Sequence, residues 1–223
     1  MGAAIGQSLP VAVGVLISPL PIVAVVLMLV SPGGRANALA FLLGWIVAVG
    51  VVVVVVAMLA GASAPQDGGT PAGAPWLKVV LGVLLLLVAW RQWRGRPRPG
   101  TEPPAPRWMA AVDAVSPVKA AGLAVLLGVV NPKNLLLVLS GGTAIASGAA
   151  GDTTAQLVAG VVFAVVASLG VAAPVVIDLS MGERAATLLD ELKDWMTRHD
   201  AVIMAVLLLV LGAKMIGDGI SGL

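Results

Sequence analysis

Two short motifs place small polar residues beside proline in the middle of long apolar stretches. They are Ser18-Pro19-Leu20-Pro21 and Asn131-Pro132-Lys133-Asn134. Proline removes a backbone donor and pushes the residue before it out of helical geometry, so each motif predicts a broken helix. Backbone groups freed at membrane depth are tolerated only against protein or a water-lined cavity, which makes both breaks candidate binding sites. The alternative is that both motifs are plain proline kinks.

Lys133 carries the only charge within these motifs. A lysine near the centre of a spanning helix costs about 2.5–3.5 kcal/mol on insertion scales, so it usually faces an interior path or a partner. Lys133 either has a structural role, by snorkelling or pairing with Asp178, or receives an anionic headgroup or carboxylate. The predicted substrate-binding residues are Ser18, Pro19, Pro21, Asn131, Pro132, Lys133, Asn134 and Asp178.

The side chains needed for metal, redox or hydrolytic chemistry are scarce. The chain has no Cys, no Tyr and a single histidine, His199. The common ligand sets of haem, zinc and di-iron sites are therefore missing, and no Ser–His arrangement supports a hydrolase. Asp178 closes an apolar segment, where a solvated helix end is favoured over a proton carrier. We expect no enzyme activity, no metal and no cofactor.

The elements that position both motifs are membrane-spanning helices. Of the 223 residues, 59% are hydrophobic and 11% are charged, against about 25% charged in soluble domains, which excludes a soluble globule. A spanning helix needs about 20 apolar residues, and the unbroken runs lack the alternation of a barrel. The gaps between charges predict an all-α polytopic protein with six spans, at about 3–30, 37–60, 76–90, 118–147, 154–177 and 200–220.

The charges of the loops predict the orientation of these spans. Connections after the first, third and fifth spans carry Lys and Arg, whereas those after the second and fourth carry Asp67 and Asp152 without Lys or Arg. By the positive-inside rule the basic connections are cytoplasmic, and both termini are then extracytoplasmic. The net charge is only +2, and the pI near 9.4 comes from the clustered arginines, so it describes a local patch and gives no reason to expect nucleic acid as a partner.

The central linker indicates two halves within a single integral membrane domain, 1–223. Residues 94–117 are rich in Pro and Arg and separate a three-helix repeat at 1–93 from a second at 118–223. Three helices per half give the halves opposite orientations, which is the requirement for an inverted repeat. The proline motifs then occupy matching places, in the first helix of each half.

Charged residues near the span ends can be explained by contact with the membrane surface or with each other. Lys78 can snorkel to the nearby surface, and Lys214 with Asp218 forms an outer pair four residues apart. Ser180 to Glu183 has capping-box spacing, and the following apolar residues recur at helical periodicity, which predicts a separate helix along the cytoplasmic interface.

The six spans, both proline motifs, Ser31-Pro32 and the basic central loop resemble the GAP family of peptidoglycolipid and sulfolipid addressing proteins, within the LysE superfamily of exporters. The resemblance implies an actinobacterial plasma-membrane protein that moves a cell-envelope glycolipid or related amphiphile outward. Its partners would be membrane lipids and an amphiphilic or anionic substrate, and the Gly-rich helices permit a homo-oligomer. Two alternatives stay open, namely a LysE-like exporter of an amino acid or ion, and a non-transporting scaffold for a lipid-export machine.

Overall fold

The computed structural model describes residues 1–31, 33–62, 74–96, 115–182 and 185–222, and no strand occurs among them. The helices, in chain order, are α1 (Gly2–Leu16), α2 (Pro19–Val30), α3 (Gly34–Ala62), α4 (Ala74–Arg94), α5 (Pro117–Val125), the π-helix η2 (Leu126–Val130), α6 (Pro132–Gly148), α7 (Thr153–Met181) and α8 (Ala185–Ile220). The prediction of an all-α fold is confirmed. Several residues used in the predictions lie outside the described residues, namely Pro32, Asp67, Glu183 and 97–114 of the predicted linker.

Four described helices are long and apolar enough to cross a membrane alone: α3, α4, α7 and the Ala201–Ile220 part of α8. Two further candidates are bent pairs, α1 with α2 at 49° and α5–η2 with α6 at 66°. The described chain therefore has up to six spans, if each bent pair crosses as one. The third span is longer than the predicted 76–90, because α4 continues through its basic end to Arg94.

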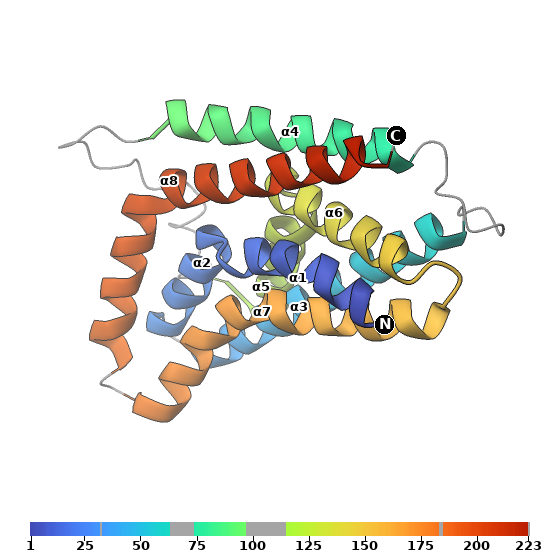
Figure 1. Ribbon diagram of the computed structural model, residues 1–223. Helices are drawn as coiled ribbons and strands as arrows, with labels where there is room; N and C mark the ends of the chain where they lie inside the picture. The colour runs from blue at the N-terminus through green and yellow to red at the C-terminus, as the bar shows by residue number, and fades with distance from the viewer. Residues whose placement is uncertain (32, 63–73, 97–114, 183–184, 223) are drawn as a thin grey trace.

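The bundle has both chain termini at the same end, as an even number of crossings requires (Figure 1). α4 and α8 run side by side along one flank, and α1, α3, α6 and α7 pack together beside them. The largest fully buried side chains of this central group include Trp45, Phe41, Phe163 and Leu137. The core is thus built by the two proline-bearing spans together with α3 and α7.

The outward faces of the helices carry large apolar side chains. On α3, four such residues spaced at four-residue intervals or multiples of them are more than half exposed: Leu43, Val47, Val51 and Leu59. A soluble protein rarely shows an apolar stripe of this length, whereas hydrocarbon is its natural solvent. These faces are the lipid-contacting surface of the bundle.

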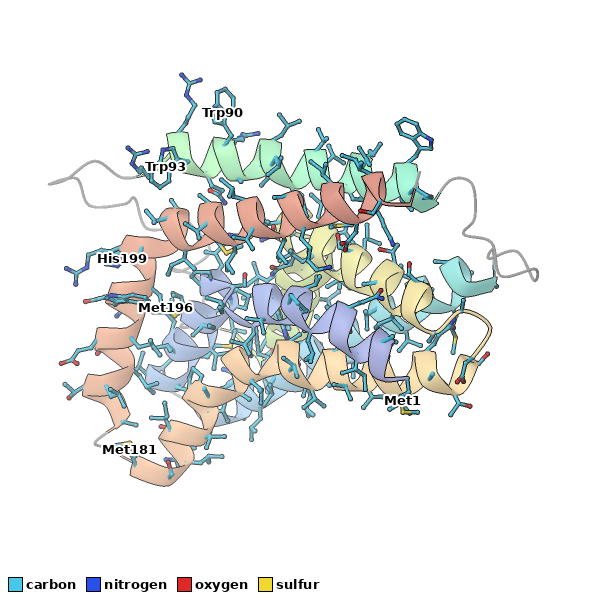
Figure 2. All side chains as sticks on the ribbon, in the orientation of Figure 1. Met1, Trp90, Trp93, Met181, Met196 and His199 are labelled. Carbon is cyan, nitrogen blue, oxygen red and sulfur yellow. The ribbon has the colours of Figure 1, made fainter. Side chains whose placement is uncertain are left out.

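Tryptophan residues mark one end of the bundle, as an aromatic belt predicts. Trp90 and Trp93 of α4 are exposed and lie with His199 toward the end opposite Met1 (Figure 2). The guanidinium groups of Arg94 and Arg96 stack over these rings, with 4.6 Å and 4.2 Å to the ring centroids. Such stacking anchors α4 at an interface between apolar and polar surroundings.

The predicted start of the interfacial helix is wrong. Ser180 lies within α7 and its hydroxyl donates to the carbonyl of Ile177 at 3.1 Å, so it does not cap a new helix. Gly182 ends α7 with a φ of 58°, a left-handed value that glycine adopts readily. The capping-box pattern matches by residue type, but its first residue is still inside α7.

The amphipathic segment itself is present, as the first part of α8. Figure 1 shows α8 turning, so that this part lies across the end of the bundle before the helix runs along α4. Its buried Ala185, Leu189 and Met196 pack in clusters with residues of α2, among them Ile22 and Val26. The segment therefore holds α2, the half-helix that follows the first proline motif.

Candidate functional site

The first predicted break is present at Ser18. Its φ of −64° and ψ of 112° are extended, and α2 begins at Pro19. A serine in this position normally accepts from the backbone N–H of the second or third helical residue. The third residue is Pro21, which has no N–H, and the Ser18 hydroxyl makes no capping bond. Ser18 is 1% exposed and its Oγ has no hydrogen-bond partner.

The second predicted break, at Asn131, has nearly the same backbone geometry. Its φ is −61° and its ψ is 118°, and α6 begins at Pro132. Here the cap is made, because Asn131 Oδ1 accepts from the backbone N–H of Lys133 at 3.1 Å. The two motifs therefore bend the chain alike and differ in how their polar groups are satisfied.

A π-helical turn, η2, precedes the second break and explains the position of Asn134. Asn131 N donates to the carbonyl of Leu126 at 2.8 Å, a five-residue step. The next such step would use Pro132, which has no N–H to offer to Leu127. Asn134 Nδ2 donates to the Leu127 carbonyl instead, at 2.8 Å. Asn134 is fully buried and its Oδ1, left by this arrangement, has no hydrogen-bond partner.

The register between α1 and α6 brings the two breaks to the same level. A side chain added at Gly148 would meet Ala4, and one added at Gly14 would lie 3.6 Å from Cδ1 of Leu137. The two helices are therefore antiparallel, and partner numbers sum to about 151. Continuing one turn from Gly14 toward the break places Ser18 level with Lys133. The unsatisfied hydroxyl thus lies at the height of the lysine.

Each break is also covered by a helix from elsewhere in the chain, the second break by α3 and the first by α7. A side chain at Gly128 of η2 would lie 3.3 Å from the indole of Trp45 in α3. Gly170 of α7 lies against the Leu16 carbonyl that precedes the first break, with no room for a side chain. Close backbone approach of this kind is what glycine permits between membrane helices.

Three buried side-chain atoms in the described residues have no hydrogen-bond partner, namely Ser18 Oγ, Trp45 Nε1 and Asn134 Oδ1. All three belong to the breaks or to the indole that covers one of them. Buried polar groups are satisfied in most native structures, and each exception calls for an explanation such as a ligand or water. Together they offer one indole donor, one amide acceptor and one hydroxyl that can do both.

The two charged residues of the predicted site lie on different helices, α6 and α7. Lys133 is 6% exposed at the start of α6, beside the second break. Asp178 lies near the end of α7, where its Oδ2 accepts from Arg35 Nε at 2.8 Å. An arginine 143 residues away in the sequence thus holds the carboxylate of Asp178, and the pair between Lys133 and Asp178 stays a prediction.

The sequence reasoning missed Trp45. Trp45 belongs to neither proline motif, yet it lies in the middle of α3, is fully buried and stacks on Phe41 with 6.3 Å between ring centroids. The usable signal was its place in the sequence, eight residues inside the predicted span at 37–60. A tryptophan at that depth has an N–H that water cannot reach.

The described residues contain no group of three His, Asp or Glu side chains that could hold a metal ion. His199 lies on the first part of α8, where its ring stacks on Trp195 and Nδ1 lies 2.8 Å from the Trp195 carbonyl oxygen. Among the residues of the two proline motifs, Lys133 is the one with a charged side chain.

An open apolar groove lies between α3 and the helices that lead into the second break. It has a volume of about 420 Å³, and the residues lining it are Gly44, Val47, Ala48, Val51, Val52, Ala121, Gly122, Val125 and Val129. Val129 is two residues before Asn131, so the groove reaches the level of the break. Acyl chains or apolar side chains are the groups that such a surface can accept.

The family model described as Sap, sulfolipid-1-addressing protein, matches residues 9–221. The chain belongs to this family. The matched region contains both proline motifs and all described helices except the beginning of α1. No curated protein and no solved structure matches the chain. Family and fold together make it a membrane protein linked to lipid handling, in agreement with the resemblance drawn from the motifs.

Proposed function

We propose that this protein is a plasma-membrane transporter that moves the polar headgroup of a cell-envelope glycolipid or related amphiphile outward across the bilayer. The headgroup binds between the two breaks, and its acyl chains stay beside the helices in lipid. The observation that carries this proposal is the set of unpartnered buried atoms at the two breaks, at the level of Lys133.

Electrostatics favours a headgroup with acceptor oxygens. Lys133 brings a positive charge to a dry region, where a charge-assisted hydrogen bond is about twice as strong as a neutral one. Trp45 Nε1 offers a further donor, and Asn134 Oδ1 can accept from a sugar hydroxyl. An anionic, hydroxylated headgroup would use all of these groups, whereas a hydrocarbon would leave them unsatisfied.

A headgroup can reach the breaks only if the helices move. Ser18, Lys133 and Asn134 are all buried, so the helices that meet at the breaks must separate before a headgroup can enter. We infer that the halves 1–93 and 118–223 form an inverted repeat, since their breaks have matching backbone angles. Alternating opening of two related halves around a central site is the general behaviour of such repeats.

The apolar groove favours a lipid over the small solute that a LysE-like exporter would carry. All nine lining residues are apolar or glycine, and the groove faces outward between α3 and α5. A small polar solute has no use for this surface, whereas an amphiphile can keep its chains there while its headgroup crosses. A scaffold without transport activity would need neither the groove nor the unpartnered atoms.

The experiment is a headgroup translocation assay with the full chain in liposomes. The probe is galactosylceramide sulfate with a fluorescent acyl chain, and external dithionite measures the fraction in the outer leaflet. We expect Lys133→Met to slow translocation by about tenfold or more, the value of one lost charge-assisted hydrogen bond. Lys133→Arg keeps the charge and should retain much of the rate.

Lys119→Met is the matched control, since Lys119 is an exposed lysine at the start of α5. It should translocate at the wild-type rate. A folded Lys133→Met protein that also translocates at the wild-type rate would contradict the proposal. Absence of translocation by the wild-type chain in liposomes would favour the scaffold.

A further inference from the structure

We propose a second binding site for the same headgroup, at the end of the bundle where both termini lie. It rests on the proposed function and would hold the headgroup before or after it passes the breaks. The site is a pocket where four helices from both halves meet, with Gln7 of α1, Lys78 of α4, Thr143 of α6 and Lys214 of α8 among its lining residues.

The pocket is small and polar on one side. Its enclosed volume is about 30 Å³, room for one or two water molecules, and Lys214 and Asp218 at its edge are exposed. Only the tip of a headgroup can enter, and the remainder would lie toward solvent. Ser140 is 2% exposed and forms the inner wall with Val11 and Leu211.

The charges favour a group with one negative charge. Lys214 Nζ donates to Asp218 Oδ2 at 2.6 Å, and Lys78 makes no ion pair with any residue that the structure describes. Two lysines and one aspartate leave a net charge of +1. A lysine ammonium near the end of a span with no carboxylate partner is suited to a sulfate or phosphate ester.

The hydroxyl groups of Ser140 and Thr143 already donate their protons within the protein. Ser140 Oγ donates to the Leu136 carbonyl at 2.7 Å, and Thr143 Oγ1 donates to the Ser140 carbonyl at 3.0 Å. Their protons are therefore used, and their oxygens can only accept from a ligand. Sugar hydroxyls are suitable donors, so the pocket is matched to a hydroxylated anion rather than to a bare one.

The pocket and the breaks lie along the same seam, between α1 and α6. Val11 and Ser140 both line the pocket, and their numbers sum to 151, the register that places Ser18 level with Lys133. Two helical turns separate Val11 from Ser18, or about 10 Å at 1.5 Å per residue. Both sites therefore lie along a single pair of helices, about two helical turns apart.

The test measures lipid binding rather than transport. The full chain is placed in phosphatidylcholine nanodiscs, and binding of galactosylceramide sulfate, galactosylceramide and phosphatidic acid is measured by native mass spectrometry. We expect the sulfated lipid to bind more tightly than its neutral parent, and Lys78→Met to weaken that binding by about tenfold. Lys78→Arg should bind as the wild type does, and Lys119→Met is the control at the other end.

Each result of the binding experiment supports or overturns the second site. Equal binding of the sulfated and neutral lipids, or equal losses in Lys78→Met and Lys119→Met, would overturn the second site. Tighter binding of phosphatidic acid than of the sulfated lipid would assign the site to phosphate esters. If Lys78→Met has no effect on binding while Lys133→Met still slows translocation, the second site fails and the proposed function stands.

Discussion

The two breaks share a backbone geometry and differ in their chemistry. Ser18 and Asn131 have ψ values of 112° and 118°, and both precede a proline that begins a new helix. At the second break, Asn131 caps α6, and Asn134 donates to the Leu127 carbonyl that has lost its backbone donor to proline. At the first break, the Ser18 hydroxyl has no partner. We infer that the second break is the rigid side of the site and the first is the side that moves.

Glycine contacts test whether each break is held by the opposite half. Gly170→Ala puts a methyl group onto the main-chain carbonyl of Leu16, which cannot move aside as a flexible side chain can. We expect a loss of about 3 kcal/mol in unfolding free energy, near the upper end for overpacking. Unfolding by SDS titration in mixed micelles measures it.

Gly44→Ala makes the equivalent change on the other side, against the backbone of Ala121, and should also destabilise. Gly122→Ala is the control, because nothing lies within 4 Å of the added methyl. A Gly170→Ala protein as stable as Gly122→Ala would mean that α7 does not hold the first break.

Side-chain removal should affect the breaks unequally. Asn134→Leu leaves the Leu127 carbonyl without its donor in a dry region, which costs about 2 kcal/mol. Ser18→Ala removes a group with no partner, so stability should be unchanged or higher. The same SDS titration compares them. Equal destabilisation by the two substitutions would show that the breaks do not differ in this way.

Restoring a backbone donor should stabilise the first break alone. Pro21→Ala supplies an N–H at the third helical position, where it can donate to Ser18 Oγ and add about 1 kcal/mol. The gain should vanish when Ser18→Ala is combined with it, which a double-mutant cycle measures. A gain that persists in the double mutant would come from another source.

The smallest effect is expected away from both breaks, at the ion pair of Arg35 and Asp178. The side chain of Arg35 is 61% exposed and that of Asp178 is 15% exposed; solvent around the guanidinium weakens the pair, and exposed pairs contribute about 0.2–1 kcal/mol. Arg35→Gln should therefore lower stability by less than either Gly170→Ala or Asn134→Leu, and it should leave translocation unchanged. A large loss of transport in this variant would indicate that Asp178 takes part in headgroup binding.

The breaks and the spans could be predicted because their causes are local. Proline at Pro19 and Pro132 acts on its own neighbours, and apolar length is read directly from the chain. The partner of Asp178 could not be predicted, because Arg35 is 143 residues away and is brought there by the packing of α3 and α7. The role of Trp45 likewise depends on which glycine it meets across the bundle.

The failed cap at Ser180 has a related cause. A capping box is defined by residue types, but Gly182 can take a positive φ that turns the chain before a helix begins. The π-helical turn before Asn131 was also outside the reach of sequence patterns, since it follows from a shift of one residue in hydrogen bonding.

The most direct test of the account is a reversible lock between the two breaks. The chain has no cysteine, so Ser18→Cys with Asn134→Cys introduces the only pair, and the register places the two at the same level. We expect oxidation to link them and to stop translocation of the fluorescent sulfated lipid in liposomes, and reduction to restore it, whereas each single variant should translocate at one rate with and without the oxidant. Translocation that continues in the fully linked protein, or failure of the pair to link at all, would contradict the claim that the breaks meet and must separate to move a headgroup.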